Sequence, residues 1–184
     1  MKKLILILAL LPTMAYAQYP IVEDFTSATG WTFTNGAGIM IYTPILPFPA
    51  DTVASTNLGN TPYPNSSIID IVSPVWDLSD CGVDLEVSFG LSGTIENGWD
   101  FMYFEYYNGS AWISVDVFTG YKPPGNIESY FIPATAIQFR FRTETDATVN
   151  TGGGSVYFYD IDNFTIDCAL DLPVELTYFD GECG

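Results

Sequence analysis

The sequence has no histidine, few cationic side chains and only three cysteines, and each shortage excludes a class of function. Five of its 184 residues are lysine or arginine and 22 are aspartate or glutamate, so the formal net charge is −17 at pH 7. Without histidine, a Ser-His-Asp or Cys-His catalytic device cannot be built. A zinc site is not expected either, because the chain also lacks a Cys-x-x-Cys pair.

The charge also bears on the partners of the protein. A strongly negative chain is repelled by nucleic acid and by anionic membrane surfaces. It suits divalent cations or neutral ligands, although solubility alone is an equally good explanation of the acidity. The oligomeric state does not follow from the sequence.

The first 17 residues have the pattern of a secretory signal peptide. Two lysines follow Met1, an apolar run covers Leu4–Leu11, and Ala15-Tyr16-Ala17 ends the segment. The apolar run is too short to span a bilayer, which takes about 20 residues. Cleavage after Ala17 would leave an exported protein, secreted or held at the cell surface, whose remaining cations are Lys122, Arg140 and Arg142.

Export permits disulfides, and three cysteines leave at least one without a partner in this chain. Cys81 follows the segment Trp76–Asp80, and Cys168 follows the last long strand that the sequence predicts. We therefore predict that Cys81 pairs with Cys168.

The composition favours one folded domain built from strands. Aromatic residues make up 16% of the chain and charged residues 15%, which is ample material for a core. The clearest strand is Val83–Leu91, whose apolar residues stand at every odd position. Ile137–Arg142 alternates in the same way. Asp100–Tyr107 and Ala111–Phe118 flank Asn108-Gly109, which supplies the positive φ values of a tight hairpin turn.

Other segments are expected to be short strands or loops. Such recurring strands, separated by Gly, Pro, Asn and Asp, are typical of an antiparallel sandwich or barrel. The earlier strands are expected at Ile21–Phe25, Trp31–Thr34, Gly38–Thr43 and Ser67–Ser73, and the loops at Pro44–Pro49, Tyr121–Asn126 and Thr148–Gly154.

The longest β-prone run after the leader is Gly154–Asp167, and it contains two acidic residues, Asp160 and Asp162. A central strand is covered on both faces, so carboxylates inside it need partners. Because the chain has few cations, this run indicates a metal ion rather than catalysis. Either Asp160 and Asp162 point to water, or a cation meets them.

Several segments together resemble a known family. They are Glu23-Asp24-Phe25 with Gly30-Trp31, Ser73–Ser79, Asp100–Glu105, Asn108–Trp112, Phe139-Arg140-Phe141 and Tyr159–Ile166. In this order they resemble jelly-roll domains related to the MAM domain, which occur in exported multidomain proteins of Bacteroidota-type bacteria. The resemblance implies an all-β, antiparallel jelly-roll β-sandwich over residues 18–168.

The same resemblance implies a structural calcium ion that ties the first strand to the last. The matching residues are Glu23, Asp24, Asp162 and Asn163. Asp162 matches the Asp of the family's last strand and is the expected ligand, whereas Asp160 stands where the family has an apolar residue and is expected to face water. Carboxylate and amide oxygens suit calcium, which takes six to eight oxygen ligands. The alternative is that these are exposed acids near strand ends.

Residues 169–184 are expected to form a linker and the start of another β module. Leu172–Gly184 resembles the opening of a small β-sandwich that often follows in such proteins and leads to a type IX secretion sorting domain. We interpret the chain as a truncated product on this basis.

The candidate ligand-binding residues are exposed aromatics. Trp99 and Tyr121 stand in predicted loops. Tyr106 and Tyr107 lie near the hairpin turn and face opposite sides of their strand, so one of them is expected to be exposed, and Tyr107 is the one chosen. Core packing is the alternative for each aromatic, and the resemblance implies this role for Trp31, Trp76 and Trp112. Glu96 and Asp100 flank Gly98-Trp99 as an acid pair, but acids are too abundant for this pair to indicate glycoside hydrolysis.

The sequence therefore predicts a non-catalytic exported module for adhesion or carbohydrate recognition, with a neutral glycan or a surface protein as partner. Two alternatives remain, which are a ligand-free spacer in a larger surface protein and an accessory domain of an exported hydrolase.

Overall fold

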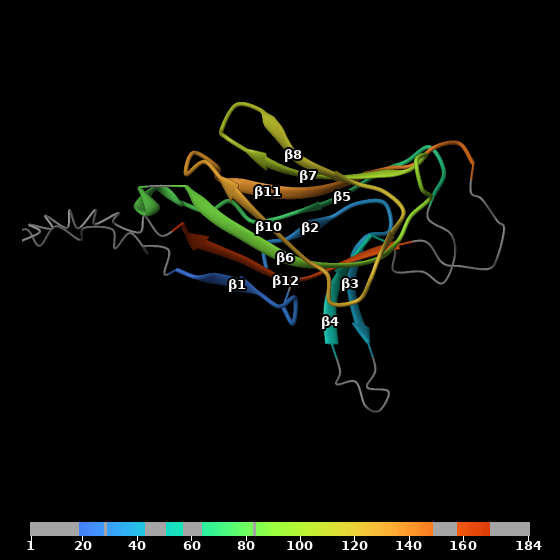
Figure 1. The fold of residues 1–184 in the computed structure, drawn as a ribbon, viewed down its shortest axis with the longest axis horizontal. Coiled ribbons are helices and arrows are strands. Elements are labelled where there is room, and N and C mark those ends of the chain that lie inside the picture. The colour runs from blue at the N-terminus through green and yellow to red at the C-terminus, as the bar shows by residue number, and fades with distance from the viewer. Residues whose placement is uncertain are drawn as a thin grey trace, which may run out of the picture.

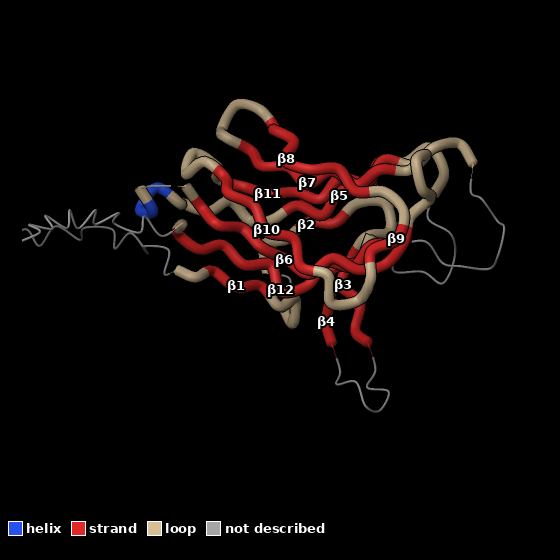
Figure 2. The backbone as a smooth tube through the Cα atoms, viewed as in Figure 1, coloured by secondary structure: helices blue, strands red, loops and turns tan. Residues whose placement is uncertain are grey.

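The computed structural model describes residues 19–27, 29–42, 51–56, 64–82, 84–148 and 158–169. The predicted signal peptide, the Pro44–Pro49 loop and the segment Leu172–Gly184 lie outside these residues. In the described part, two antiparallel sheets face each other as a jelly-roll β-sandwich, which confirms the predicted fold class (Figures 1 and 2). No helix among these residues has the length and hydrophobicity needed to cross a bilayer.

The larger sheet, sheet A, has the strand order β10-β6-β12-β4-β3, with β1 beside β12 and β9 beside β6. Its strands are β1 (Ile21–Glu23), β3 (Gly38–Tyr42), β4 (Asp51–Ser55), β6 (Leu85–Thr94), β9 (Tyr121–Lys122), β10 (Ile127–Ile132) and β12 (Phe158–Cys168).

The smaller sheet, sheet B, has the order β2-β5-β11-β7-β8. Its strands are β2 (Thr32–Phe33), β5 (Ile68–Val72), β7 (Phe101–Tyr107), β8 (Trp112–Phe118) and β11 (Gln138–Glu144), and a short 3-10 turn, η1, covers Ser79–Cys81.

The predicted long strand near the end of the chain is β12, and it lies in the middle of sheet A between β6 on one side and β1 and β4 on the other. Its Phe164 is fully buried and forms the centre of the aromatic core. The Phe164 ring contacts rings from both sheets, with centroids 6.3 Å from Phe89 of β6 and 5.6 Å from Phe139 of β11. Burying such large side chains supplies most of the stability of a domain of this size.

The alternating strands agree with their predicted faces. Leu85, Val87, Phe89 and Leu91 of β6 are buried, and so are Phe139 and Phe141 of β11. Trp31 is buried and Trp76 packs against the core, as expected. Trp112 instead lies against Tyr107 on sheet B, under the guanidinium of Arg140.

The hairpin between β7 and β8 forms where predicted, but its turn differs from a tight two-residue turn. Tyr107 pairs with Trp112, so the connection covers residues 108–111. Gly109 alone takes a positive φ there, of 89°. The Asn108 side chain closes the turn instead, because its Oδ1 accepts hydrogen bonds from the N–H groups of Ser110 and Ala111, each at 3.0 Å.

Two further expectations need correction, and two strands were not predicted. Tyr121–Asn126 is not entirely loop, because Tyr121 and Lys122 pair with β6 as β9. Asp160 does not face water; it is only 4% exposed. The strands β4 and β10 have no counterpart in the prediction, and β10 breaks the usual pattern because its Ile127 and Phe131 are 73% and 71% exposed on an edge strand.

Candidate functional site

The candidate site begins at the turn that joins β6 to β7. The N–H groups of Trp99 and Asp100 donate to the carbonyl of Glu96 at 3.4 and 3.1 Å, and Gly98 takes the positive φ that the turn requires. Thr119 fixes the turn from the next connection, since its hydroxyl accepts from Gly98 N–H at 2.8 Å and donates to the Glu96 carbonyl at 3.2 Å. The tight turn sends neighbouring side chains in opposite directions, leaving Trp99 64% exposed and Asp100 only 1% exposed.

The opposite wall comes from the connection between β8 and β9. The carbonyl of Gly120 accepts hydrogen bonds from Ile95 N–H at 3.1 Å and from the buried Tyr159 hydroxyl at 2.7 Å. Gly120 has a φ of 72°, and a side chain there would come within 3.0 Å of the Asn97 amide oxygen. Both constraints hold the segment in place, and Tyr121 follows it with 68% of its surface exposed.

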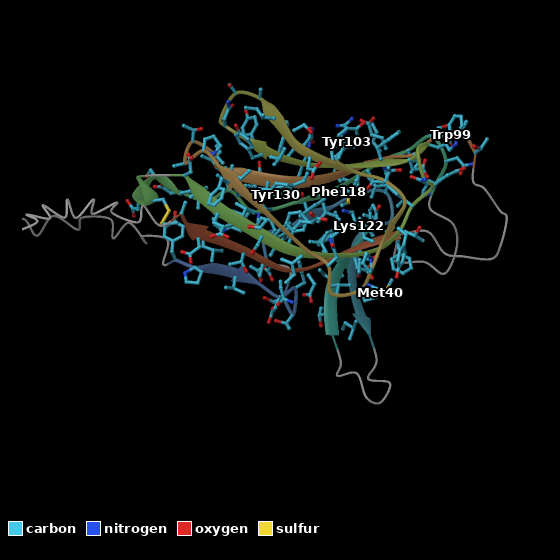
Figure 3. The ribbon with its side chains drawn as sticks, in the orientation of Figure 1. Met40, Trp99, Tyr103, Phe118, Lys122 and Tyr130 are labelled. Atoms are coloured by element: carbon cyan, nitrogen blue, oxygen red, sulfur yellow. A yellow bond between two sulfur atoms is a disulfide. The ribbon has the colours of Figure 1, made fainter. Side chains whose placement is uncertain are left out.

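These two walls enclose the aromatic cleft, a depression of about 650 Å³ lined by Thr94, Ile95, Glu96, Asn97, Trp99, Thr119, Gly120 and Tyr121. Trp99 lies at one end of the sandwich (Figure 3). The lining combines two exposed aromatic side chains with hydroxyl and amide groups and with Glu96, and it contains no cationic side chain. It can therefore offer stacking faces and hydrogen-bond partners to a hydroxyl-rich, uncharged ligand.

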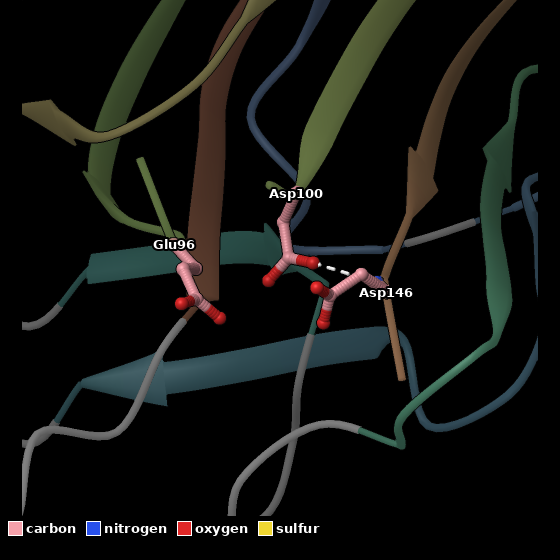
Figure 4. Close-up of side chains that lie close together, drawn as sticks. All are labelled: Glu96, Asp100 and Asp146. Atoms are coloured by element: carbon pink, nitrogen blue, oxygen red, sulfur yellow. Dashed lines mark hydrogen bonds between the residues drawn. The ribbon is translucent and has the colours of Figure 1, made fainter. Parts of the chain in front are cut away.

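Beside the cleft lies the acidic cluster of Glu96, Asp100 and Asp146, whose nearest carboxylate oxygens are all within 4.8 Å of one another (Figure 4). Asp146 reaches this place from the segment after β11, and its N–H donates to Asp100 Oδ1 at 2.8 Å. The Asp146 carboxylate also accepts from the N–H of Thr148 at 2.7 Å. Among the described residues, this is the one group of three or more acidic side chains so close together.

The electrostatics of the acidic cluster fit a cation. Burial, reinforced by the neighbouring charge of Asp146 and opposed by the hydrogen bond from its N–H, raises the pKa of the Asp100 carboxyl. Carboxylates so close together repel one another unless a positive charge is near. The three cations of the described residues form ion pairs with other acids, namely Lys122 with Glu128, Arg140 with Glu105 and Arg142 with Glu144.

The residues predicted to hold calcium lie elsewhere. The first and last strands are adjacent, as expected, with Glu23 of β1 opposite Phe164 of β12. Yet the Glu23 oxygens accept from Phe25 N–H at 2.9 Å and from the Trp31 indole N–H at 3.2 Å. Asp24 is exposed and accepts from Thr26, which lowers its pKa.

The predicted calcium ligands on β12, Asp162 and Asn163, also form hydrogen bonds. The Asp162 carboxylate accepts from the backbone N–H and from the side-chain amide of Asn163, each at 2.7 Å. These residues stand at a bulge in β12 and line a second cavity, away from the acidic cluster. Glu23, Asp24 and Asp162 are therefore not brought together as one carboxylate group.

The predicted aromatic candidates divide into two groups. Trp99 and Tyr121 share the aromatic cleft. Tyr107 does not, because it stands at the far end of β7, about 20 Å along the strand from Asp100. It is half-buried against Trp112, with ring centroids 5.3 Å apart.

The structure joins Cys81 to Cys168 in a disulfide with a Cα–Cα distance of 5.3 Å. It links η1 to the end of β12, at the opposite end of β6 from Thr94 and the aromatic cleft.

Sequence reasoning missed Asp146. Glu96 and Asp100 attracted notice only as a pair, and Asp146 stands 46 residues from Asp100. The antiparallel register could have found it, because β7 and β11 pair Phe101 with Glu144 and so place the residues before Phe101 beside those after Glu144.

Comparisons with known proteins add the fold but no family. No protein-family model matches the sequence, and no curated protein was found to match it. The chain is 12% identical to the K1 cleaved adhesin domain of Lys-gingipain from Porphyromonas gingivalis W83, with a TM-score of 0.58 over 83% of this chain and 100% of that domain.

Two further solved structures are similar. An exo-β-agarase is 13% identical, with a TM-score of 0.50, over 80% of this chain but only 24% of that chain. The C-terminal family 22 carbohydrate binding module of Clostridium thermocellum Xyn10B is 15% identical, over 81% of this chain and 93% of that chain, at a TM-score of 0.46. At these identities the likeness to the adhesin domain and to the agarase establishes the sandwich fold alone.

Proposed function

We propose that this chain is a non-catalytic exported module that recognises neutral glycans through the aromatic cleft. The observation that carries the proposal is that Trp99 and Tyr121 both line one depression and are 64% and 68% exposed. Large aromatic side chains gathered at a surface mark an interaction site. Their flat faces stack against the C–H faces of sugar rings.

The polar lining fits the same ligand. Asn97, Thr94 and Thr119 offer an amide and hydroxyls, and Glu96 offers carboxylate oxygens that accept hydrogen bonds from sugar hydroxyls. With no cation in the lining and a net charge of −17, the cleft disfavours acidic glycans. The sandwich fold, which an adhesin domain and an exo-β-agarase also contain, supports a role in adhesion or carbohydrate recognition.

We propose in addition that a calcium ion binds the acidic cluster and braces the cleft. Calcium takes six to eight oxygens, and the cluster supplies three carboxylates whose nearest oxygens lie within 4.8 Å of one another. Glu96 belongs both to the cluster and to the lining of the cleft, so the ion would hold one wall of the binding site. The Glu23, Asp24, Asp162 and Asn163 site remains a rival proposal for the same ion.

Export and the place of the domain in a larger protein also belong to the proposal. A disulfide persists in oxidising compartments, so Cys81–Cys168 supports export after cleavage of residues 1–17. The MAM-like resemblance supports a domain over residues 18–168, followed at 169–184 by the start of a module associated with type IX secretion.

A glycan array tests the function. The folded protein should bind members of a set of neutral polysaccharides, and Trp99→Ala or Tyr121→Ala should weaken that binding at least tenfold. Tyr107→Ala, an aromatic truncation outside the cleft, should leave it unchanged. An array on which no neutral glycan is bound, or binding that both cleft variants retain, would rule out the proposal and favour a ligand-free spacer.

A further inference from the structure

A second cavity, the sheet-face cavity, lies on the outer face of sheet A. Its volume is about 460 Å³, and its lining includes Ser88, Gly90 and Ser92 of β6, Asn126 of the β9–β10 connection, and Asp160 and Asp162 of β12. The buried residues of β6 alternate with these positions, so Ser88, Gly90 and Ser92 face away from the core.

The two cavities follow one another along β6. Thr94, the next outward position after Ser92, already lines the aromatic cleft. Thr94 pairs with Tyr121, so the side chains of both residues point to the same face of the sheet. From Ser88 to Thr94 the strand advances about 20 Å, which makes a continuous row of small outward positions that ends at an aromatic pair.

Small residues keep this row open. At Gly90 an added Cβ would lie 3.4 Å from the Asp162 carbonyl oxygen and 3.9 Å from that of Asn126. Any larger side chain at position 90 must extend into the cavity. The lining holds hydroxyl, amide and carboxylate groups without a cation, so it presents hydrogen-bond acceptors and donors to a hydroxyl-rich chain and repels an anionic one.

We propose that the ligand is a linear, uncharged polysaccharide chain that stacks on Trp99 and Tyr121 and continues along β6 into the sheet-face cavity. This inference rests on the proposed function, because the chain is anchored in the aromatic cleft. It adds the substrate class, which is an extended stretch of chain rather than a single terminal sugar. The aromatic cleft supplies the anchor, and the sheet-face cavity supplies hydrogen bonds that only a longer ligand reaches.

Oligosaccharide series test the proposal. Titration calorimetry would use neutral xylo-, cello- and agaro-oligosaccharides, from the disaccharide to the hexasaccharide, against the folded protein. For the series that binds, we expect the affinity to rise about tenfold or more with length, since a few net hydrogen bonds suffice for such a gain. Ser92→Leu and Gly90→Val should remove that rise and leave the disaccharide affinity unchanged. Ser92→Ala adds no atoms to the sheet-face cavity, so this variant should keep most of the increase in affinity with oligosaccharide length.

The outcomes separate the two proposals. If affinity does not grow with length, or if Ser92→Leu and Gly90→Val both keep the growth, the extended chain is excluded while the aromatic cleft stands. If no series binds, or if Trp99→Ala binds the disaccharide as the unaltered protein does, both proposals fail. Should a filling variant unfold, NMR of the unaltered protein decides: the hexasaccharide but not the disaccharide should shift the amide signals of Ser88 and Thr165, and unshifted signals would contradict the extended chain.

Discussion

At the scale of single residues, identical side chains differ in what surrounds them. Trp31 is 6% exposed and packs between Phe25 and Phe164, whereas Trp99 is 64% exposed at a turn held by Glu96 and Thr119. The first contributes to the core and the second is available to a ligand. Local sequence alone does not distinguish them, because each tryptophan follows a glycine shortly before a strand. Trp99 was expected to be exposed because it stands in a predicted loop, and the core role of Trp31 followed from the family resemblance.

Asp70 gives a prediction at this scale. It lies on β5 opposite Arg142, and its Oδ1 is buried without a hydrogen-bond partner among the described residues. Burial, only partly offset by Arg140 and Arg142, raises its pKa. The folded state therefore holds this proton more tightly than the unfolded chain, so ionisation of Asp70 destabilises the fold as the pH rises above about 3.9. Asp70→Asn should raise the melting temperature at pH 7, and the gain should vanish by pH 3.

Asp77→Asn is the matched control, because it removes one carboxylate whose pKa is lowered by hydrogen bonds from Ser79. The stabilisation by ionised Asp77 is present above the ordinary pKa and is lost as the pH falls through the lowered one. Its replacement should therefore not stabilise the protein at pH 7. If the Asp70→Asn protein had a lower melting temperature than the unaltered protein at pH 7, ionised Asp70 would not destabilise the fold.

The burial of individual acidic side chains could be predicted least well from the sequence. Asp160 and Asp162 look alike in the sequence, yet Asp160 is only 4% exposed and Asp162 is half-buried at a bulge. Asp160 is more buried than Asp162 because β4 pairs with the backbone of Asp160. The β-propensity of the sequence around β4 did not predict that strand. The aromatic candidates Trp99 and Tyr121 were easier to identify, because both were expected in loops.

At the scale of elements, antiparallel pairing brings distant residues together. The β7–β11 register places Asp100 beside Asp146, and the β6–β9 pair places Thr94 beside Tyr121. The strands with strict alternation, β6 and β11, could be predicted from the sequence because one face of each is core and the other is not. Edge strands such as β10 could not, since their apolar residues also face outward.

The disulfide gives a prediction for the elements that it joins. Cys81 and Cys168 are 87 residues apart, so the bond strongly restricts the unfolded chain. Replacing both with serine should lower the free energy of unfolding by about 2–5 kcal/mol, measured by urea denaturation. Cys183→Ser, which leaves this bond intact, should not change the unfolding midpoint. An unchanged midpoint in the double variant would mean that the bond does not hold η1 to β12.

At the scale of the whole molecule, acidic residues far outnumber cations, so carboxylates repel one another. A calcium ion bound at the acidic cluster should relieve this repulsion there. At a concentration a hundred times its dissociation constant, a bound ion adds about 2.7 kcal/mol of stability. That corresponds to a rise of about 5–10 °C in the melting temperature of a chain of this size. We expect this rise with calcium and its loss with chelator.

Two variants locate the ion. Asp146→Asn should remove the calcium-dependent rise if the acidic cluster is the site, whereas Asp24→Asn should leave it intact. The reverse result would assign the ion to the rival site of Glu23, Asp24, Asp162 and Asn163, between β1 and β12. A melting temperature that calcium and chelator leave equal would exclude a stabilising site at either place.

The central claim is that a neutral glycan covers Trp99. The most direct measurement is acrylamide quenching of tryptophan fluorescence, because Trp99 is exposed while the other three tryptophans are buried or half-buried. Saturating concentrations of the glycan selected on the array should protect the quenchable fraction of the emission, and Trp99→Phe should remove both that fraction and its protection. Quenching that stays the same with bound glycan would contradict the claim.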